Sequence, residues 1–186
     1  QFQPERFPEA SLHDDLRLGF NRALFSWYVI DPLFFRNDNI TPDNINNKRH
    51  YQREVTENEV FPDRELPAGT PANIATLDLA FYPQDRGPYN YDAAPTATSS
   101  GIDPQTGDLN DPETRWGGMQ RAINTTDFEQ TNVEFIQFWI MDPYNEDNRN
   151  YVGTAGNPNA RLLVNLGNVS EDVLRDGRMS FENGLP

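Results

Sequence analysis

Two short apolar runs stand out from an otherwise polar sequence. One covers residues 24–30 and the other covers residues 135–141, and an Asp-Pro pair follows each. Both runs are rich in aromatic and β-branched residues, which favour strands, and proline cannot donate a hydrogen bond within a sheet. They predict one strand within residues 18–35 and another over 132–141. The second is apolar on both faces, as a central strand of a sandwich would be.

Weaker patterns predict three further strands. Small or polar and larger apolar residues alternate over 74–82, which is typical of a half-buried strand, and Pro83 closes it. Residues 116–124 and 161–166 are the other two candidates. The segment 51–62 fits either a short helix or a strand, and Pro62 would end both.

Helix signals are few. Residues 170–177 begin with Ser170 as an N-cap, carry acids in the first turn and end at Gly177, which together predict a short helix. A weak helical turn is expected near residues 12–16. With five strands and so little helix, we expect a mainly β chain, an antiparallel β-sandwich of jelly-roll type with long loops and one or two short helices.

Composition sets the size of the core. The 186 residues suit one domain, predicted over 18–186 after an irregular lead-in at 1–17. Hydrophobic residues are only 36% of the chain, although aromatic residues supply 12% and each buries a large area. The 15 prolines and 12 glycines favour turns, and long loops are predicted at 36–50, 92–114 and 144–160. A modest core under many loops is therefore expected.

The net charge of −14 excludes some partners and functions. Such a surface repels phosphate backbones, so nucleic-acid binding is not expected. The absence of cysteine excludes disulfides, Cys-ligated zinc and thiol nucleophiles. No signal peptide or membrane helix is visible. Because the chain lacks a starting methionine, we expect a piece of a longer protein, although processing would also explain that start.

No catalytic constellation emerges from the residue pattern. The two histidines, His13 and His50, lie in polar surroundings, and a serine triad or a zinc site needs a better placed His. Residues 103–111 contain acids and a glycine, which suits Ca²⁺, but they lack the full EF-hand pattern, and a solvated turn explains them more simply. We expect no enzyme, no cofactor and no metal.

Four residues are candidates for binding. Arg86, Tyr89 and Tyr91 follow the strand predicted at 74–82, and Trp116 precedes two glycines. Exposed aromatic rings of this kind stack on sugars or anchor partner proteins. The alternative is structural, because Arg86 can pair locally while the tyrosines pack under their loop and Trp116 plugs the end of a sheet.

Several ordered blocks of the sequence resemble a known family. They are residues 21–32, 53–55 with 59–62, 82–91, 115–121, 126–129, 134–143, 165–178 and 181–186. Within them are the runs Tyr-Pro-Gln-Asp-Arg-Gly-Pro-Tyr-Asn-Tyr from Tyr82 and Arg-Trp-Gly-Gly-Met-Gln-Arg from Arg115. In these blocks the chain resembles the SprA/Sov family of very large gliding-motility and secretion proteins, over about residues 18–186.

The resemblance implies an internal segment of the outer-membrane translocon of the type IX secretion system. That family forms a giant β-barrel through which folded cargo proteins leave the cell, and gliding adhesins depend on it. The implied partners are the rest of the barrel, a docking barrel protein, a periplasmic plug and secreted cargo. The implied location is the cell outer membrane, with this segment exposed to water as a scaffold or partner surface. A carbohydrate-binding β-sandwich module of a cell-surface protein is the alternative that the aromatic residues leave open, and a Ca²⁺-dependent adhesin is a third.

Overall fold

The computed structural model describes residues 11–12, 14–31, 54–69, 73–125, 127–141 and 161–166. Within it the chain divides into two compact units. Unit 1 comprises Gln1–Ser26, Leu79–Gln120 and Asn159–Pro186, and unit 2 comprises Trp27–Asp78 and Arg121–Pro158. Several predictions concern residues outside the described ranges: His13, His50, the loops at 36–50 and 144–160, and the helix at 170–177. The single-domain prediction for 18–186 likewise stays a prediction.

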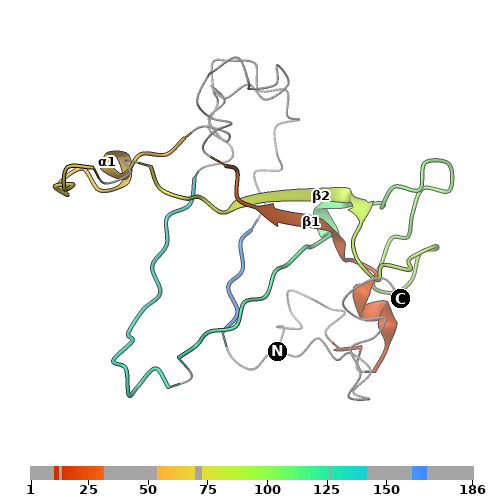
Figure 1. Cartoon of the computed structure of the whole chain (residues 1–186). Coiled ribbons are helices and arrows are strands. Elements are labelled where there is room, and N and C mark those ends of the chain that lie inside the picture. The colour runs from red at the N-terminus through yellow and green to blue at the C-terminus, as the bar shows by residue number, and fades with distance from the viewer. Residues whose placement is uncertain are drawn as a thin grey trace, which may run out of the picture. The chain divides into compact units, whose positions relative to one another are not determined.

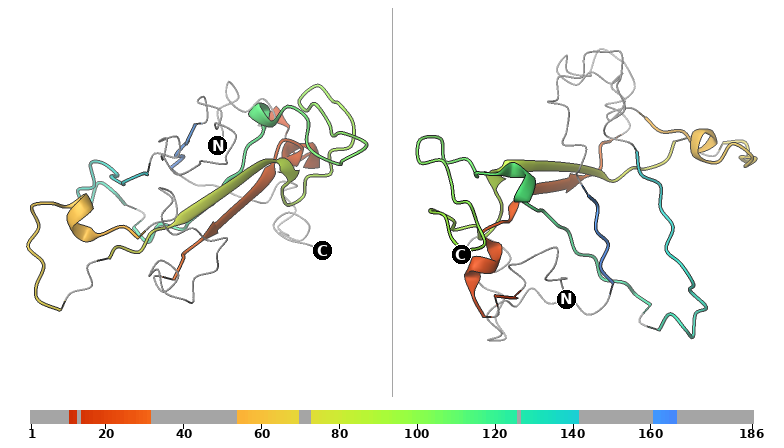
Figure 2. Two further views of the ribbon diagram at one scale, coloured as in Figure 1. Left: turned by 90° about the horizontal axis from the view of Figure 1, so that it is seen from above. Right: turned by 180° about the vertical axis from the view of Figure 1, so that it is seen from behind.

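The regular structure centres on two strands. β1 (Ala23–Tyr28) and β2 (Asp78–Arg86) lie side by side in a two-stranded antiparallel sheet (Figures 1 and 2). The strand expected within 18–35 is thus confirmed. The strand expected at 74–82 is also confirmed, but it begins at Asp78 and runs through Pro83 to Arg86. In a two-stranded sheet both strands are edges, so a residue without an N–H can face away from the partner.

The alternation predicted for β2 is present, but its larger side chains lie on the more exposed face. Leu77, Leu79 and Phe81 are 48%, 44% and 43% exposed. Their neighbours Asp78 and Ala80 are less exposed. Phe25 of β1 contacts Phe81 with ring centroids 6.5 Å apart. The sheet therefore carries an apolar face that the described residues cover only in part.

Three of the predicted strands are not formed in the described part of the chain. Residues 132–141 and 161–166 have no strand assignment, and 116–124 contributes only an isolated parallel bridge between Trp116 and Arg22. No residue from 134 to 141 makes a backbone hydrogen bond to another described residue. A strand exists only where a partner completes its ladder, and strand-forming residues alone cannot supply one.

Helices are short. η2 (Leu16–Gly19) is a 3-10 helix one turn beyond the helical turn expected near 12–16, and the Asp15 side chain accepts a hydrogen bond from Arg17 N. α1 (Glu57–Val60) shows that the ambiguous segment 51–62 includes a helix, and η5 (Pro112–Thr114) lies at the end of the loop at 92–114. None of the helices in the described ranges has the length and apolar character required to cross a membrane. The chain is mainly β with little helix, as expected.

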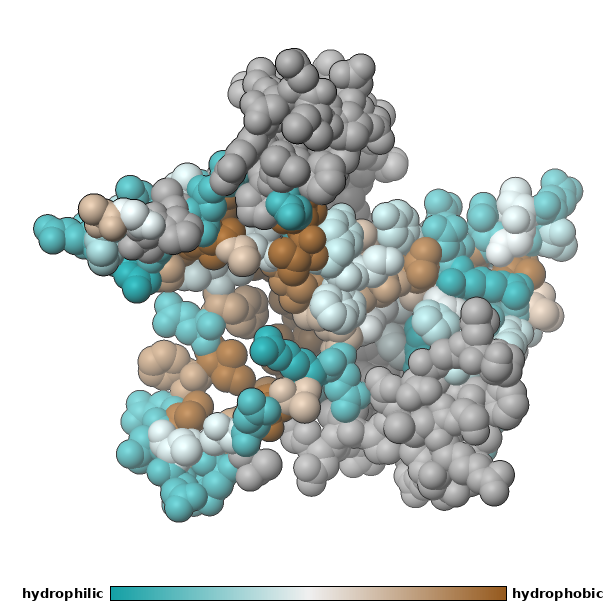
Figure 3. Space-filling view, viewed as in Figure 1, coloured by the Kyte–Doolittle hydropathy of each residue, from teal (hydrophilic) through white to brown (hydrophobic). Residues whose placement is uncertain are grey.

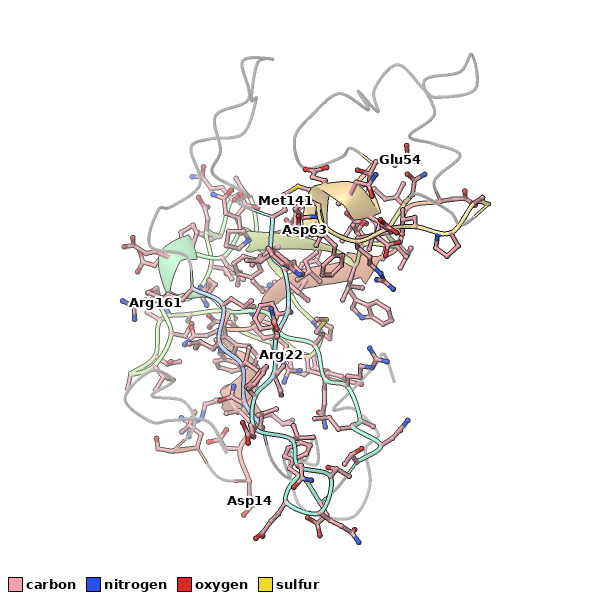
Figure 4. All side chains as sticks on the ribbon, turned by 90° about the vertical axis from the view of Figure 1, so that its left-hand side faces the viewer. Asp14, Arg22, Glu54, Asp63, Met141 and Arg161 are labelled. Carbon is pink, nitrogen blue, oxygen red and sulfur yellow. The ribbon has the colours of Figure 1, made fainter. Side chains whose placement is uncertain are left out.

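The buried apolar core is small. Among the described residues it comprises Ala23 and Leu109 in unit 1 and Val55 in unit 2. Val55 lies beside α1, where its carbonyl accepts a hydrogen bond from Ile74 N, and Glu54 and Asp63 on either side of this helix are labelled in Figure 4. Hydrophobic residues reach the surface of the described part (brown in Figure 3). Many large aromatic and aliphatic side chains are exposed, among them Phe135 at 74% and Trp139 at 66%. Polar contacts therefore contribute more to unit 1 than its apolar core does.

Candidate functional site

The four candidate binding residues all lie in unit 1, around one end of the sheet. Arg86 is the last residue of β2, and a turn closed by Asn90 N donating to Gly87 O at 3.2 Å follows it. Tyr89 takes a left-handed conformation in this turn, with φ of 58°. Trp116 reaches the same end of the sheet from the other side, since Ala23 N donates to Trp116 O at 2.8 Å. We call Arg22, Arg86, Tyr89, Tyr91 and Trp116 the aromatic corner.

Glycines allow the close approach of backbones at this corner. A Cβ on Gly87 would lie 2.4 Å from Ala23 O, and one on Gly117 would lie 2.6 Å from Phe25 Cβ. Both distances are too short for any side chain. The Gly-Pro and Trp-Gly-Gly runs of the sequence therefore serve close packing against β1.

The rings of the aromatic corner are held in defined contacts. The Arg22 guanidinium lies 5.3 Å from the centroid of the Trp116 ring, and Arg22 Nη1 donates to Pro88 O at 3.4 Å (Arg22 is labelled in Figure 4). Tyr89 and Tyr91 meet edge to face with centroids 6.3 Å apart. Tyr91 remains 52% exposed, whereas Trp116 is half-buried. Tyr91 is therefore the exposed ring of the corner, since Tyr89 is half-buried and Arg22 covers one face of Trp116.

Arg86 pairs locally, as its structural interpretation required. Its Nη2 donates to the main-chain oxygen of Asp92 at 2.7 Å. Asn90 completes the turn, because its side-chain nitrogen donates to Phe20 O at 2.8 Å and to Arg22 O at 2.7 Å. Its side-chain oxygen accepts from Asp92 N at 3.0 Å. The turn after β2 is thereby joined to the segment that enters β1.

Arg115 organises the centre of unit 1, and no pattern in the sequence pointed to it. Its side chain is 0% exposed and forms an ion pair with Asp92, whose side chain is also 0% exposed, with Nη1 and Oδ2 3.4 Å apart. The guanidinium donates to three backbone carbonyls, which belong to Asn110 (2.8 Å), Phe20 (3.0 Å) and Gly101 (2.9 Å). A planar guanidinium suits such a set, because it presents five N–H donors in fixed directions.

Side chains complete the surroundings of Arg115. Arg115 Nη1 also donates to Asn21 Oδ1 at 3.1 Å and to Ser99 Oγ at 3.2 Å. Ser99 Oγ donates to Asp92 Oδ2, while Asp92 Oδ1 is buried and has no hydrogen-bond partner among the described residues. We call Arg115, Asp92, Ser99, Asn21 and Asn90 the Arg115 cluster. Its members come from three distant parts of the sequence, so it joins the start of β1 to the loop at 92–114.

That loop is ordered by its own polar groups. Leu109, which is buried, donates its N–H to Gln84 O of β2 at 2.8 Å. Asn110 N donates to Gly101 O at 3.0 Å, and Ile102 pairs with Leu109 in an antiparallel bridge. A long loop is usually functional or mobile. Here it packs against the edge of β2 and encloses Arg115.

The acidic stretch 103–111 forms a turn. Asp103 Oδ1 accepts from Gln105 N at 2.7 Å, and Asp103 N donates to Asp108 O at 2.8 Å. These contacts form the turn that the simpler interpretation predicted. Within the described ranges, no group of three or more histidine or acidic side chains is placed to bind a metal ion.

The Arg115 cluster was the feature that sequence reasoning missed. Arg115 and Asn90 lie inside the blocks 115–121 and 82–91, so the resemblance marked their neighbourhood without assigning them a role. Asp92 and Ser99 lie in the loop, where an acid and a serine are usually exposed. A comparison with models of known protein families finds no match for the chain, and neither does a comparison with curated proteins.

Proposed function

We propose that this chain is a water-exposed structural segment of an outer-membrane protein-conducting translocon, of the type used in type IX secretion and gliding motility. Its role is non-enzymatic, as a scaffold or partner surface. One observation carries the proposal. Three of the blocks that resemble the SprA/Sov family meet in unit 1, where block 21–32 contacts both of the others. Asn90 of block 82–91 donates to Arg22 O, and block 115–121 contacts it through Trp116 O and through Arg115, which donates to Asn21 Oδ1.

The contacts between these blocks favour a scaffold. Arg86 and Arg115 donate mainly to main-chain carbonyls, and Arg115 also donates to three side chains of its cluster. Such bonds fix the path of the backbone. Charged groups used in this way maintain a shape rather than perform chemistry. The proposal includes a β-sandwich for the complete domain, with the exposed apolar face of β2 as one of its inner faces.

Fractionation of cells that produce the native protein tests the location. An antibody raised against residues 1–186 is used to blot outer-membrane, periplasmic and cytoplasmic fractions. The proposal predicts one very large band in the outer membrane. A soluble band of the size of this chain alone would contradict it.

A chromosomal variant pair tests the role. Tyr91→Ala removes the most exposed ring of the aromatic corner, and Tyr82→Ala, which removes an exposed ring of β2, is the control. If the corner is a partner surface, Tyr91→Ala reduces the export of cargo at an unchanged level of translocon in the outer membrane, and Tyr82→Ala does not. Equal export from both variants and the wild type would refute a partner role for the corner.

A carbohydrate-binding module is the second candidate, and the 52% exposure of Tyr91 beside Tyr89 favours it. The position of Arg22 over Trp116 weighs against a platform of three rings. Quenching of tryptophan fluorescence by acrylamide, with and without surface glycans of the source cell, distinguishes a carbohydrate-binding module from a scaffold. Arg22→Ala should increase the quenching of Trp116, and glycans should change nothing in either protein. Protection of Trp116 by a glycan would favour the module instead.

A further inference from the structure

The loop at 92–114 contains two Asp-Pro peptide bonds, Asp103–Pro104 and Asp111–Pro112, in different surroundings. An aspartate carboxyl can attack the carbonyl carbon of its own residue, because the two groups form a five-membered ring. An intramolecular attack of this kind gains greatly from correct orientation. When proline follows, the leaving group is a secondary amine. The surroundings of each bond therefore decide which one reacts.

Asp111 has an unusual backbone conformation for a residue that precedes proline. Its φ and ψ are 49° and 65°, in the left-handed region. Proline pushes the residue before it toward extended conformations, so this geometry is disfavoured. Asp103, by contrast, does not have a positive φ. Of the two aspartates, only Asp111 has this strained backbone conformation.

The carbonyl oxygen of Asp111 accepts two hydrogen bonds from one residue. Thr114 N donates to it at 2.9 Å, and Thr114 Oγ1 donates to it at 2.8 Å. Two donors on one carbonyl oxygen stabilise the negative charge that develops there when the carbon is attacked. The carbonyl oxygen of Asp103 accepts one backbone hydrogen bond, from Gly107 N at 2.8 Å.

The carboxyl groups of the two residues have different donors. Ser100 Oγ donates to Asp111 Oδ2, which fixes the carboxyl group and leaves Oδ1 without a hydrogen bond to any described residue. Asp103 Oδ1 instead accepts from Gln105 N at 2.7 Å and lies 3.4 Å from Thr106 N. Asp111 is exposed, so water reaches it. At both residues one carboxyl oxygen accepts hydrogen bonds and the other makes none to a described residue. The two sites therefore differ in the backbone conformation of the aspartate and in the donors to its carbonyl oxygen.

We propose that the Asp111–Pro112 peptide bond is a site of self-cleavage. Asp111 Oδ1 bonds to the Asp111 carbonyl carbon, and the bond from that carbon to Pro112 N breaks. The proton of the carboxyl group passes to Pro112 N, and Asp111 is left as a cyclic anhydride. Water then opens the anhydride to two carboxyl groups, so the net reaction is hydrolysis with water as the only co-reactant.

The Arg115 cluster would keep the two products together. Arg115 lies after the cleaved bond, while its acceptors on Asn110, Gly101 and Asp92 lie before it. The fragments 1–111 and 112–186 therefore remain associated until the fold is disrupted. This inference concerns the loop alone and does not depend on the proposed function.

The 186-residue chain is incubated in mildly acidic buffer, with and without denaturing urea, and products are identified by intact mass and N-terminal sequencing. We expect the fragment that begins at Pro112 to form about tenfold or more faster than the fragment that begins at Pro104 in native buffer. In urea the two rates should become similar, because both sites are then unstructured. Equal rates in native buffer, or no Pro112 fragment from the folded chain, would overturn the proposal.

Variants identify the groups responsible. Thr114→Val keeps the N–H donor and removes the hydroxyl donor, and it should slow cleavage about tenfold. Asp111→Asn should abolish the Pro112 fragment and leave slow cleavage at Asp103–Pro104 unchanged. Thr106→Val, which alters the first turn only, is the matched control and should not change the rate at Pro112. Unchanged cleavage in Thr114→Val would refute the role of the hydroxyl donor.

Discussion

Removal of Arg115 tests the most important contact of unit 1. In Arg115→Ala, six hydrogen bonds from the guanidinium are lost, and the buried Asp92 carboxylate loses its counter-charge. Breaking a buried ion pair by removing one partner costs about 3–5 kcal/mol. The three carbonyl groups that lose their donor do not each add a full desolvation cost to the loss of stability, because water enters the space that the side chain leaves. We therefore expect a loss of about 4 kcal/mol, a large fraction of the stability of a typical domain.

Urea denaturation, followed by circular dichroism, measures this loss. Native-state hydrogen exchange adds a local measurement. The amide of Leu109 bonds to Gln84 O of β2 and that of Asn110 bonds to Gly101 O within the loop, and both should exchange faster in the variant. Arg64→Ala is the control, because the Arg64 side chain is 64% exposed in its ion pair with Glu57 and this pair should contribute less than about 1 kcal/mol.

A paired variant separates the two parts of this effect. Replacing both partners, as Arg115→Met with Asp92→Leu, removes the stranded charge, so the double variant should lose less stability than the two single changes added together. Strict additivity would show that the two side chains do not interact. An Arg115→Ala protein within about 1 kcal/mol of the wild type would refute the cluster as the organiser of unit 1.

Two further predictions concern other parts of the chain. Gly117→Ala would place a Cβ 2.6 Å from Phe25 Cβ and should lower the free energy of unfolding by about 1–3 kcal/mol. Gly118→Ala, with nothing within 4 Å, should change it little. Equal effects of the two variants in urea denaturation would contradict this packing. The side-chain hydrogen bond from Arg17 holds the pKa of Asp15 below its ordinary value of 3.8, and Arg17→Ala should raise the NMR titration midpoint toward that value. The stability that this pair adds is present above the ordinary pKa and is lost as the pH falls through the lowered one.

The sheet was predictable because its signals are local. The aromatic and β-branched residues of β1 and the alternation that leads into β2 identify strands without knowledge of their partners. The more buried face of β2 was not predictable, since burial depends on which other segments pack there. For the same reason, residues 132–141 have a strong strand composition but no strand in the described structure.

The Arg115 cluster could not be predicted from its residue types. Three of the acceptors of Arg115 are main-chain carbonyls, and every residue has one, so no side-chain pattern marks them. Its acidic partner, Asp92, lies in a loop and is one of 29 acidic residues in the chain, so nothing in the sequence distinguishes it from the others. The candidates Arg86, Tyr89, Tyr91 and Trp116 were found because aromatic residues beside Gly and Pro are distinctive, and the structure brings them to one corner.

The hydrogen bond between Arg115 and Phe20 spans 95 residues of sequence, and this separation governs the order of events during synthesis. Ribosomes add about 5–20 residues per second, so the segment that enters β1 emerges roughly 5–20 s before the residue that fixes its end. Until β2 (Asp78–Arg86) has also been made, Leu24, Phe25 and Trp27 of β1 have no strand partner. We expect a nascent chain of this protein to recruit a holding chaperone through this segment and to release it once Arg115 has been made.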